Sequence, residues 1–169
     1  MQNRSLAIDY KSALVLVLLI SISVAAPLLN NQIITGIIVN AVLFIGASML
    51  GTSSALLLGI LPSSIALATG LLPAVLAPVI PFIIVSNSLL VISFSYVKKI
   101  NYWLGTLVAG TLKFVFLFAT SSVAISLLIN HNVAQSAAQM MGWIQLVTVL
   151  GGAILAYFVI KFFRKQSLS

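Results

Sequence analysis

Long apolar segments separated by short polar breaks follow one another along nearly the whole chain. Each segment has roughly 17 residues or more, and a helix of that length, rising 1.5 Å per residue, crosses most of the bilayer hydrocarbon. The apolar positions are continuous rather than alternating, which argues against a membrane β-barrel. The pattern therefore predicts an all-α, polytopic membrane bundle of six transmembrane helices, which forms a single integral-membrane domain over residues 1–169.

The breaks between the segments contain Asn, Gly, Pro and Lys residues, which commonly mark helix ends. The predicted spans are residues 12–29, 33–50, 53–72, 76–97, 102–129 and 140–163. Pro62, Pro78 and Pro81 lie within or beside the third and fourth spans. They predict either an irregular backbone that lines a cavity or simple punctuation of the helix ends.

Only 5% of the residues are charged, against about 25% in soluble domains, and the net charge is +7. Apart from Lys113, the basic residues are Arg4, Lys11, Lys98, Lys99, Lys161, Arg164 and Lys165. With six spans they all fall on one side, so the positive-inside rule predicts a multi-pass protein of the cell membrane with cytoplasmic N- and C-termini. Such scattered charges fit contacts with the headgroups of the lipid bilayer, and no nucleic-acid partner is expected.

The first span has an alternative interpretation as a signal peptide. Arg4 and Lys11 form a basic start, and Ser23-Val24-Ala25 resembles a cleavage site with small residues. The whole apolar stretch, from Ala13 to Leu29, is longer than the usual 7–15 residues of a signal peptide, which favours a membrane span.

The chain contains few residues that could perform catalysis. Asp9 is the only acidic residue, His131 the only histidine, and cysteine is absent. An enzyme needs acids, bases, nucleophiles or metal ligands, so we expect no catalytic residues, no metal site and no cofactor. An ion-coupled carrier is also disfavoured, because no Asp or Glu lies in a span.

Lys113 is the strongest functional candidate. A lysine at mid-membrane depth costs about 2.5–3.5 kcal/mol on insertion scales and normally pairs with a carboxylate. At 1.5 Å per residue, Asn40 lies roughly 10 Å and Asn87 roughly 16 Å from the outer face, and Lys113 lies roughly 16 Å from the inner face, which is also near mid-membrane. The three side chains could therefore converge in a substrate-binding site, although amides can also simply join helices and a lysine can extend toward a membrane surface.

Weaker polar candidates lie at or before the start of the sixth span. They are the possible substrate-binding residues Gln139 and Gln145, and His131, which we interpret as a solvated loop residue.

Small residues recur at four-residue spacing and let helix backbones approach closely. One series is Ala47, Gly51, Ala55, Gly59 and Ser63, and shorter series are Ser21 with Ala25, Gly105 with Ala109, and Thr148 with Gly152 and Ala156. Two interpretations remain open: packing inside the bundle, or a face for a partner membrane subunit formed by Ser21, Ala25, Gly51, Ala55 and Gly59.

Several of these features together resemble a known family. They are Ile38-Val39-Asn40-Ala41, the series Gly51, Gly59, Pro62 and Gly70, the segment Pro78-Val79-Ile80-Pro81 through Ser86-Asn87, and Lys113. With the chain length and six spans, they are similar to the substrate-binding S components of energy-coupling factor (ECF) transporters, and in particular to the small group often labelled "iron hydrogenase".

The resemblance implies a substrate-binding membrane subunit of an ATP-driven importer. Such a subunit captures a vitamin-like small molecule or cofactor precursor from outside, and works with a transmembrane coupling protein and two cytoplasmic ATPases. In the family a pair of alanines in the first helix docks the coupling protein; Ser21 and Ala25 are the nearest match and depart from that pattern. Family binding residues come mainly from the fourth to sixth helices, which suits Asn87, Lys113, Gln139 and Gln145 better than Asn40. The residue sets of the thiamine, biotin and riboflavin members are absent.

A different class of function is also open. The small-residue faces and Lys113 could belong to a non-transport assembly or scaffold subunit of an envelope complex, in which an acidic residue of a partner helix would pair with Lys113. Co-purification with ATPases or with envelope proteins discriminates the two.

Overall fold

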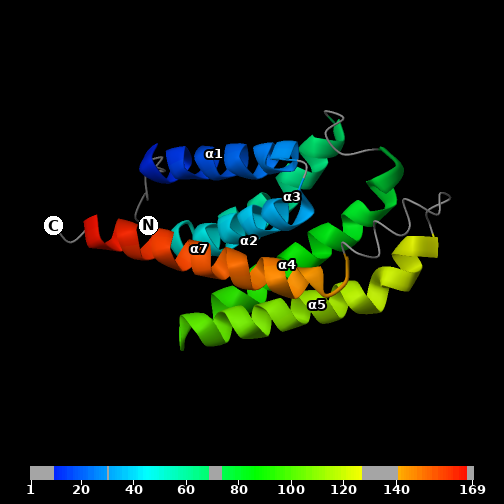
Figure 1. Cartoon of the computed structure of the whole chain (residues 1–169). Coiled ribbons are helices and arrows are strands. Elements are labelled where there is room, and N and C mark those ends of the chain that lie inside the picture. The colour runs from blue at the N-terminus through cyan, green and yellow to red at the C-terminus, as the bar shows by residue number, and fades with distance from the viewer. Residues whose placement is uncertain (1–9, 30, 69–73, 127–140, 167–169) are drawn as a thin grey trace, which may run out of the picture.

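The computed structural model describes residues 10–29, 31–68, 74–126 and 141–166, and these residues form helices and short connections without strands (Figure 1). The α-helices are α1 (Tyr10–Ala25), α2 (Gln32–Met49), α3 (Thr52–Ala68), α4 (Ile80–Val97), α5 (Tyr102–Ser126) and α7 (Ile144–Gln166). Two 3-10 helices, η1 (Ala26–Leu29) and η2 (Ala74–Val79), extend α1 and precede α4.

The described helices agree with a membrane protein. Five of them are long and apolar enough to cross a bilayer, while the apolar part of α3, Thr52–Ile65, is shorter. The prediction of an all-α fold is therefore confirmed for the described residues, and five of the six predicted spans meet the length and composition of a membrane helix. Positions 69–72, 127–129 and 140 of the predicted spans lie outside the described residues.

The largest differences from the predicted boundaries occur at α4 and α7. The fourth span was predicted to be helical from residue 76, but the chain forms η2 first and α4 begins at Ile80, with Pro81 in its first turn. A proline has no backbone donor and suits the first helical turn, so Pro78 and Pro81 punctuate this helix start. Helix α7 begins at Ile144, four residues after the predicted start, and continues to Gln166 instead of 163.

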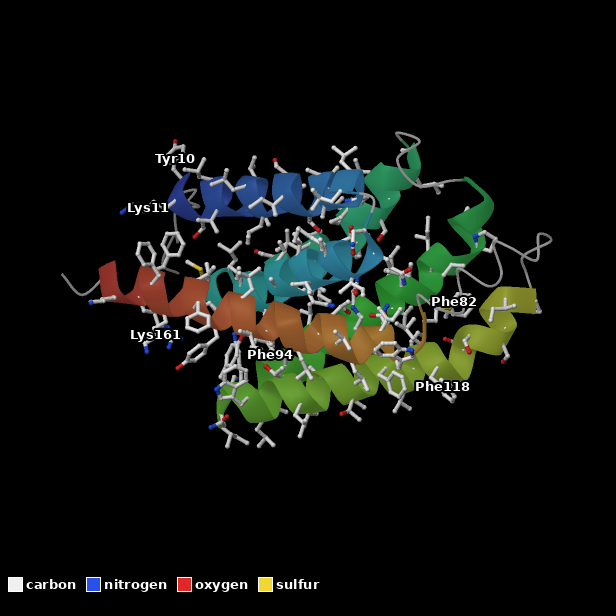
Figure 2. All side chains as sticks on the ribbon, viewed as in Figure 1. Tyr10, Lys11, Phe82, Phe94, Phe118 and Lys161 are labelled. Carbon is white, nitrogen blue, oxygen red and sulfur yellow. The ribbon has the colours of Figure 1, made fainter. Side chains whose placement is uncertain are left out.

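The helices run alternately up and down, so that the described basic residues other than Lys113 gather at one end of the bundle. Figure 2 shows Lys11 and Lys161 at this end and Phe82 and Phe118 toward the other. The connection between α4 and α5, which contains Lys98 and Lys99, also lies there. We call it the basic end; among the described residues, the opposite end carries no Lys or Arg.

Glycines allow α2 and α7 to pack closely at the centre of the bundle. A Cβ atom added at Gly152 would lie 2.7 Å from the Cβ of Asn40 and 2.8 Å from the carbonyl oxygen of Ile37. A Cβ added at Gly36 would lie 2.7 Å from the side chain of Thr148. The prediction that small residues permit close helix approach is therefore confirmed for this pair.

The four-residue series that runs from α2 into α3 is not one helical face. Helix α2 ends at Met49, and Gly51 adopts a φ of 91°, a left-handed conformation that glycine adopts without strain. Gly51 is thus an exposed turn residue. Ala55 and Gly59 are buried within the bundle, where they take part in internal packing. Ser21 and Ala25 are exposed on α1.

Candidate functional site

Lys113 is buried in the middle of the bundle and is held by two amide side chains. Its side chain is 4% exposed, and it extends from α5 toward α2 and α4. The Nζ atom donates hydrogen bonds to Oδ1 of Asn40 at 2.7 Å and to Oδ1 of Asn87 at 2.8 Å. The three residues that were expected to converge from their depths therefore do so, and Lys113 does not extend to a membrane surface.

The two amides are fixed by further hydrogen bonds on their nitrogen atoms. Asn40 Nδ2 donates to Thr148 Oγ1 at 3.1 Å, and Asn87 Nδ2 donates to the carbonyl oxygen of Gly59 at 3.3 Å. Because the nitrogens donate away from Lys113, both oxygens face the ammonium group, as a cation requires. This network joins α2, α3, α4, α5 and α7, and Asn40 and Asn87 are 1% and 2% exposed.

The positive charge of Lys113 has no acidic partner within the described part of the chain. The only acidic side chain, Asp9, lies outside the described residues. An ammonium group has three hydrogen-bond donors, and the two amide oxygens accept from two of them. Neutral oxygens satisfy donors but carry no compensating charge, so a protonated Lys113 would bring one uncompensated positive charge into the site.

A cavity of about 310 Å³ lies beside this network. Lys113, Asn40 and Asn87 line it together with mostly apolar side chains, among them Val39, Leu58, Ile83, Leu117 and Ile144. Pro62 also lines the cavity. Of the two interpretations of this proline, a cavity-lining position and the punctuation of a helix end, its place agrees with the first. The volume is at the small end of the roughly 300–1,000 Å³ typical of small-molecule sites.

The cavity extends from the middle of the bundle toward the opposite end. Its lining residues belong to the first halves of α2, α4 and α7, to the middle and later parts of α3 and α5, and to the end of α1. Since these helices alternate in direction, these parts of the helices lie from the middle of the bundle toward the end opposite to the basic end (Figure 1). The buried ammonium group is therefore at the deep end of the cavity.

Ser23 of α1 is a cavity residue that the sequence did not single out for binding. Its side chain is 1% exposed and lines the cavity, and its Oγ atom has no hydrogen-bond partner among the described residues. In the sequence, Ser23 is part only of the triplet that resembles a signal-peptide cleavage site. Leu19 and Ser23, four residues apart, are the two buried residues of α1, but this helix is apolar on every side and the spacing alone did not reveal the inner face.

The remaining predicted site residues fall in different places. Gln145 lines the cavity, while Gln139 and His131 lie outside the described residues. Thr148, considered only as a small packing residue, is a member of the polar network, and its hydroxyl donates to the carbonyl oxygen of Gln145 at 3.1 Å.

The arrangement can hold a small molecule and offers it a cation, amide groups and a hydroxyl in mainly apolar surroundings. A comparison of the chain with protein-family models, with curated proteins and with solved structures found no match.

Proposed function

We propose that this protein is the substrate-binding membrane subunit of an ATP-driven importer of the ECF type, and that it captures a vitamin-like small molecule or cofactor precursor from outside the cell. The observation that carries the proposal is the cavity with Lys113 at its deep end. A buried ionisable group inside a membrane bundle is costly and typically marks a substrate site.

The distribution of basic residues supports an orientation for uptake. Lysine and arginine are enriched on the cytoplasmic side of membrane proteins, so the basic end, and with it both termini, is assigned to the cytoplasm. The cavity then lies in the outer half of the membrane, where a ligand that arrives from outside would enter.

The energy for transport would come from other subunits. Within the described spans there is no carboxylate that could relay protons or bind a coupling ion. We therefore assign ATP hydrolysis to two cytoplasmic ATPases and contact with them to a transmembrane coupling protein. Ser21 and Ala25, small and exposed on α1, are the residues to which we assign the coupling protein.

Affinity purification of the tagged chain from its own membranes tests this proposal. We expect a coupling protein and ATPases among the recovered proteins, and their loss in the double variant Ser21→Leu/Ala25→Leu, which enlarges the assigned face. Ala119→Leu is the matched control, since Ala119 is exposed on α5. Recovery of envelope assembly proteins without ATPases would favour the scaffold alternative instead.

A further inference from the structure

We propose that the cavity selects a ligand with a single negative charge on a mainly apolar body, such as an organic monocarboxylate, and that Lys113 neutralises this charge. The inference rests on the proposed function in that it names the chemical class of the captured molecule. It adds Ser23 of α1 as a second polar contact with the ligand.

The charge of the site determines the charge of the ligand. Lys113 is the one cationic side chain among the cavity-lining residues that the structure describes, and its bonded partners Asn40 and Asn87 are neutral. A monoanion would balance it and accept from its third donor. A phosphate monoester or dicarboxylate would bring an excess negative charge into a site of low polarity, and an amine would repel Lys113.

The wall of the cavity determines the rest of the ligand. Val39, Leu58, Ile83, Leu117 and Ile144 present hydrocarbon, and burial of apolar ligand surface against them is favourable. The volume of about 310 Å³ accommodates a small molecule rather than a lipid. A monatomic anion would neutralise Lys113 but would leave these apolar walls without contacts.

Ser23 is an independent indication of a ligand. A buried hydroxyl group without a partner is rare in native structures, because its desolvation is not compensated. Within the part of the chain that the structure describes, the Oγ atom of Ser23 is such a group, and Ser23 lines the cavity on the side of α1. Ser95 of α4 also has an unpartnered buried hydroxyl, but it does not line the cavity, and it therefore serves as a matched control.

The test uses the full chain in lipid nanodiscs and matched pairs of probes. Carboxylates from butanoate to decanoate are compared with the amides and primary amines of the same length, by calorimetric titration against empty nanodiscs. We expect at least one carboxylate to bind about tenfold more tightly than its amide, and the amine of that length to bind more weakly than both. The titration is repeated with sulfate in place of chloride, because the double charge of sulfate does not suit the site, and the affinity for the carboxylate should not fall.

Two variants separate charge from shape. Asn87→Asp, nearly isosteric, gives Lys113 an internal counter-charge, so the preference for carboxylate over amide should disappear. Lys113→Gln should remove the same preference and covers the case in which Asn87→Asp does not fold. Ser23→Ala should lower the affinity for the preferred carboxylate by about threefold or more, and Ser95→Ala should leave this affinity unchanged.

Three results would overturn the inference: no carboxylate in the series preferred over its amide, a preference that persists in both charge variants, or a site that chloride fills and organic carboxylates do not enter. These outcomes are distinct from failure of the proposed function. That failure would be a chain that prefers carboxylates but is recovered without ATPases, whereas failure of the inference would be a chain that is recovered with ATPases and prefers uncharged probes.

Discussion

The Nζ atom of Lys113 lies 2.7 Å from the Oδ1 atom of Asn40, although 73 residues separate them in the chain. Replacing only one of these two residues should lower the free energy of unfolding more than replacing both. Asn40→Leu leaves a buried ammonium with one amide partner and should lower the free energy of unfolding by about 1–3 kcal/mol. Lys113→Met removes the charge itself and should cost less.

The double variant Asn40→Leu/Lys113→Met should then be more stable than the sum of the single effects predicts. A coupling energy of about 1–3 kcal/mol is expected for residues in one buried network. Denaturant titration of the four proteins in the same detergent, followed by circular dichroism, measures it. Additive effects would show that the contact contributes nothing to folding.

This contact was accessible to sequence reasoning because depth in a membrane helix follows from residue count. Asn40, Asn87 and Lys113 lie at similar distances from their span ends, and polar groups avoid lipid, so they turn inward and meet. The same reasoning found the long apolar helices, since 17 or more apolar residues in succession have few alternatives.

Other parts of the site depend on how the helices are rotated and spaced, which residue counts do not specify. The role of Ser23 requires knowledge of the inner face of α1, and that helix is apolar all round. The left-handed turn at Gly51 ends a series that reads as one continuous helical face in the sequence. The cavity itself is a property of side chains from six helices together.

Gly152 is expected to tolerate no larger residue. In Gly152→Ala the new Cβ would lie 2.8 Å from the backbone nitrogen of Ala41, and backbone atoms cannot rotate away. Overpacking of this kind costs about 1–3 kcal/mol. The higher helix propensity of alanine offsets at most about 1 kcal/mol of this cost. Thermal unfolding should therefore show a lower midpoint.

Gly151→Ala is the matched control for this variant. The three atoms nearest to its added Cβ are side-chain atoms of Ile37, the first at 2.9 Å, and a side chain can adjust. Gly151→Ala should be less destabilising than Gly152→Ala. Equal losses would mean that the closeness of α2 and α7 at Gly152 is not what limits the stability.

Lys98 is expected to stabilise the end of α2. Its Nζ atom donates to the carbonyl oxygen of Ala47, which lies in the last turn of α2 and has no further helical partner. Lys98→Met leaves this carbonyl group unpaired and should cost about 1–2 kcal/mol. Lys99→Met, at an exposed neighbouring position, should change the stability little.

The contribution of Lys98 should also depend on pH. Burial, followed by the charges of Arg164 and Lys99, lowers the pKa of Lys98 from its ordinary value of 10.5. Between the lowered pKa and 10.5 the unfolded chain binds more protons than the folded one, so folding becomes more favourable as the pH rises. The stability difference between the wild type and Lys98→Met should grow toward pH 10.5; a difference that shrinks would contradict the assigned burial of the ammonium group.

Ser23 and Ser95 should respond alike to substitution in the empty protein, in contrast to their different effects on ligand binding. Each buries a hydroxyl group for which the described residues offer no partner, and replacement by alanine removes this desolvation cost. Both Ser23→Ala and Ser95→Ala should therefore raise the unfolding free energy by about 0.5–2 kcal/mol, as measured by denaturant titration without ligand.

If Ser23→Ala destabilises the empty protein while Ser95→Ala does not, the Ser23 hydroxyl has a structural partner, and no ligand is needed to explain why a serine lies in the cavity wall. If both variants are stabilised, the protein keeps Ser23 at a cost to its own folding, which is the expected behaviour of a group that finds its partner only when the cavity is filled.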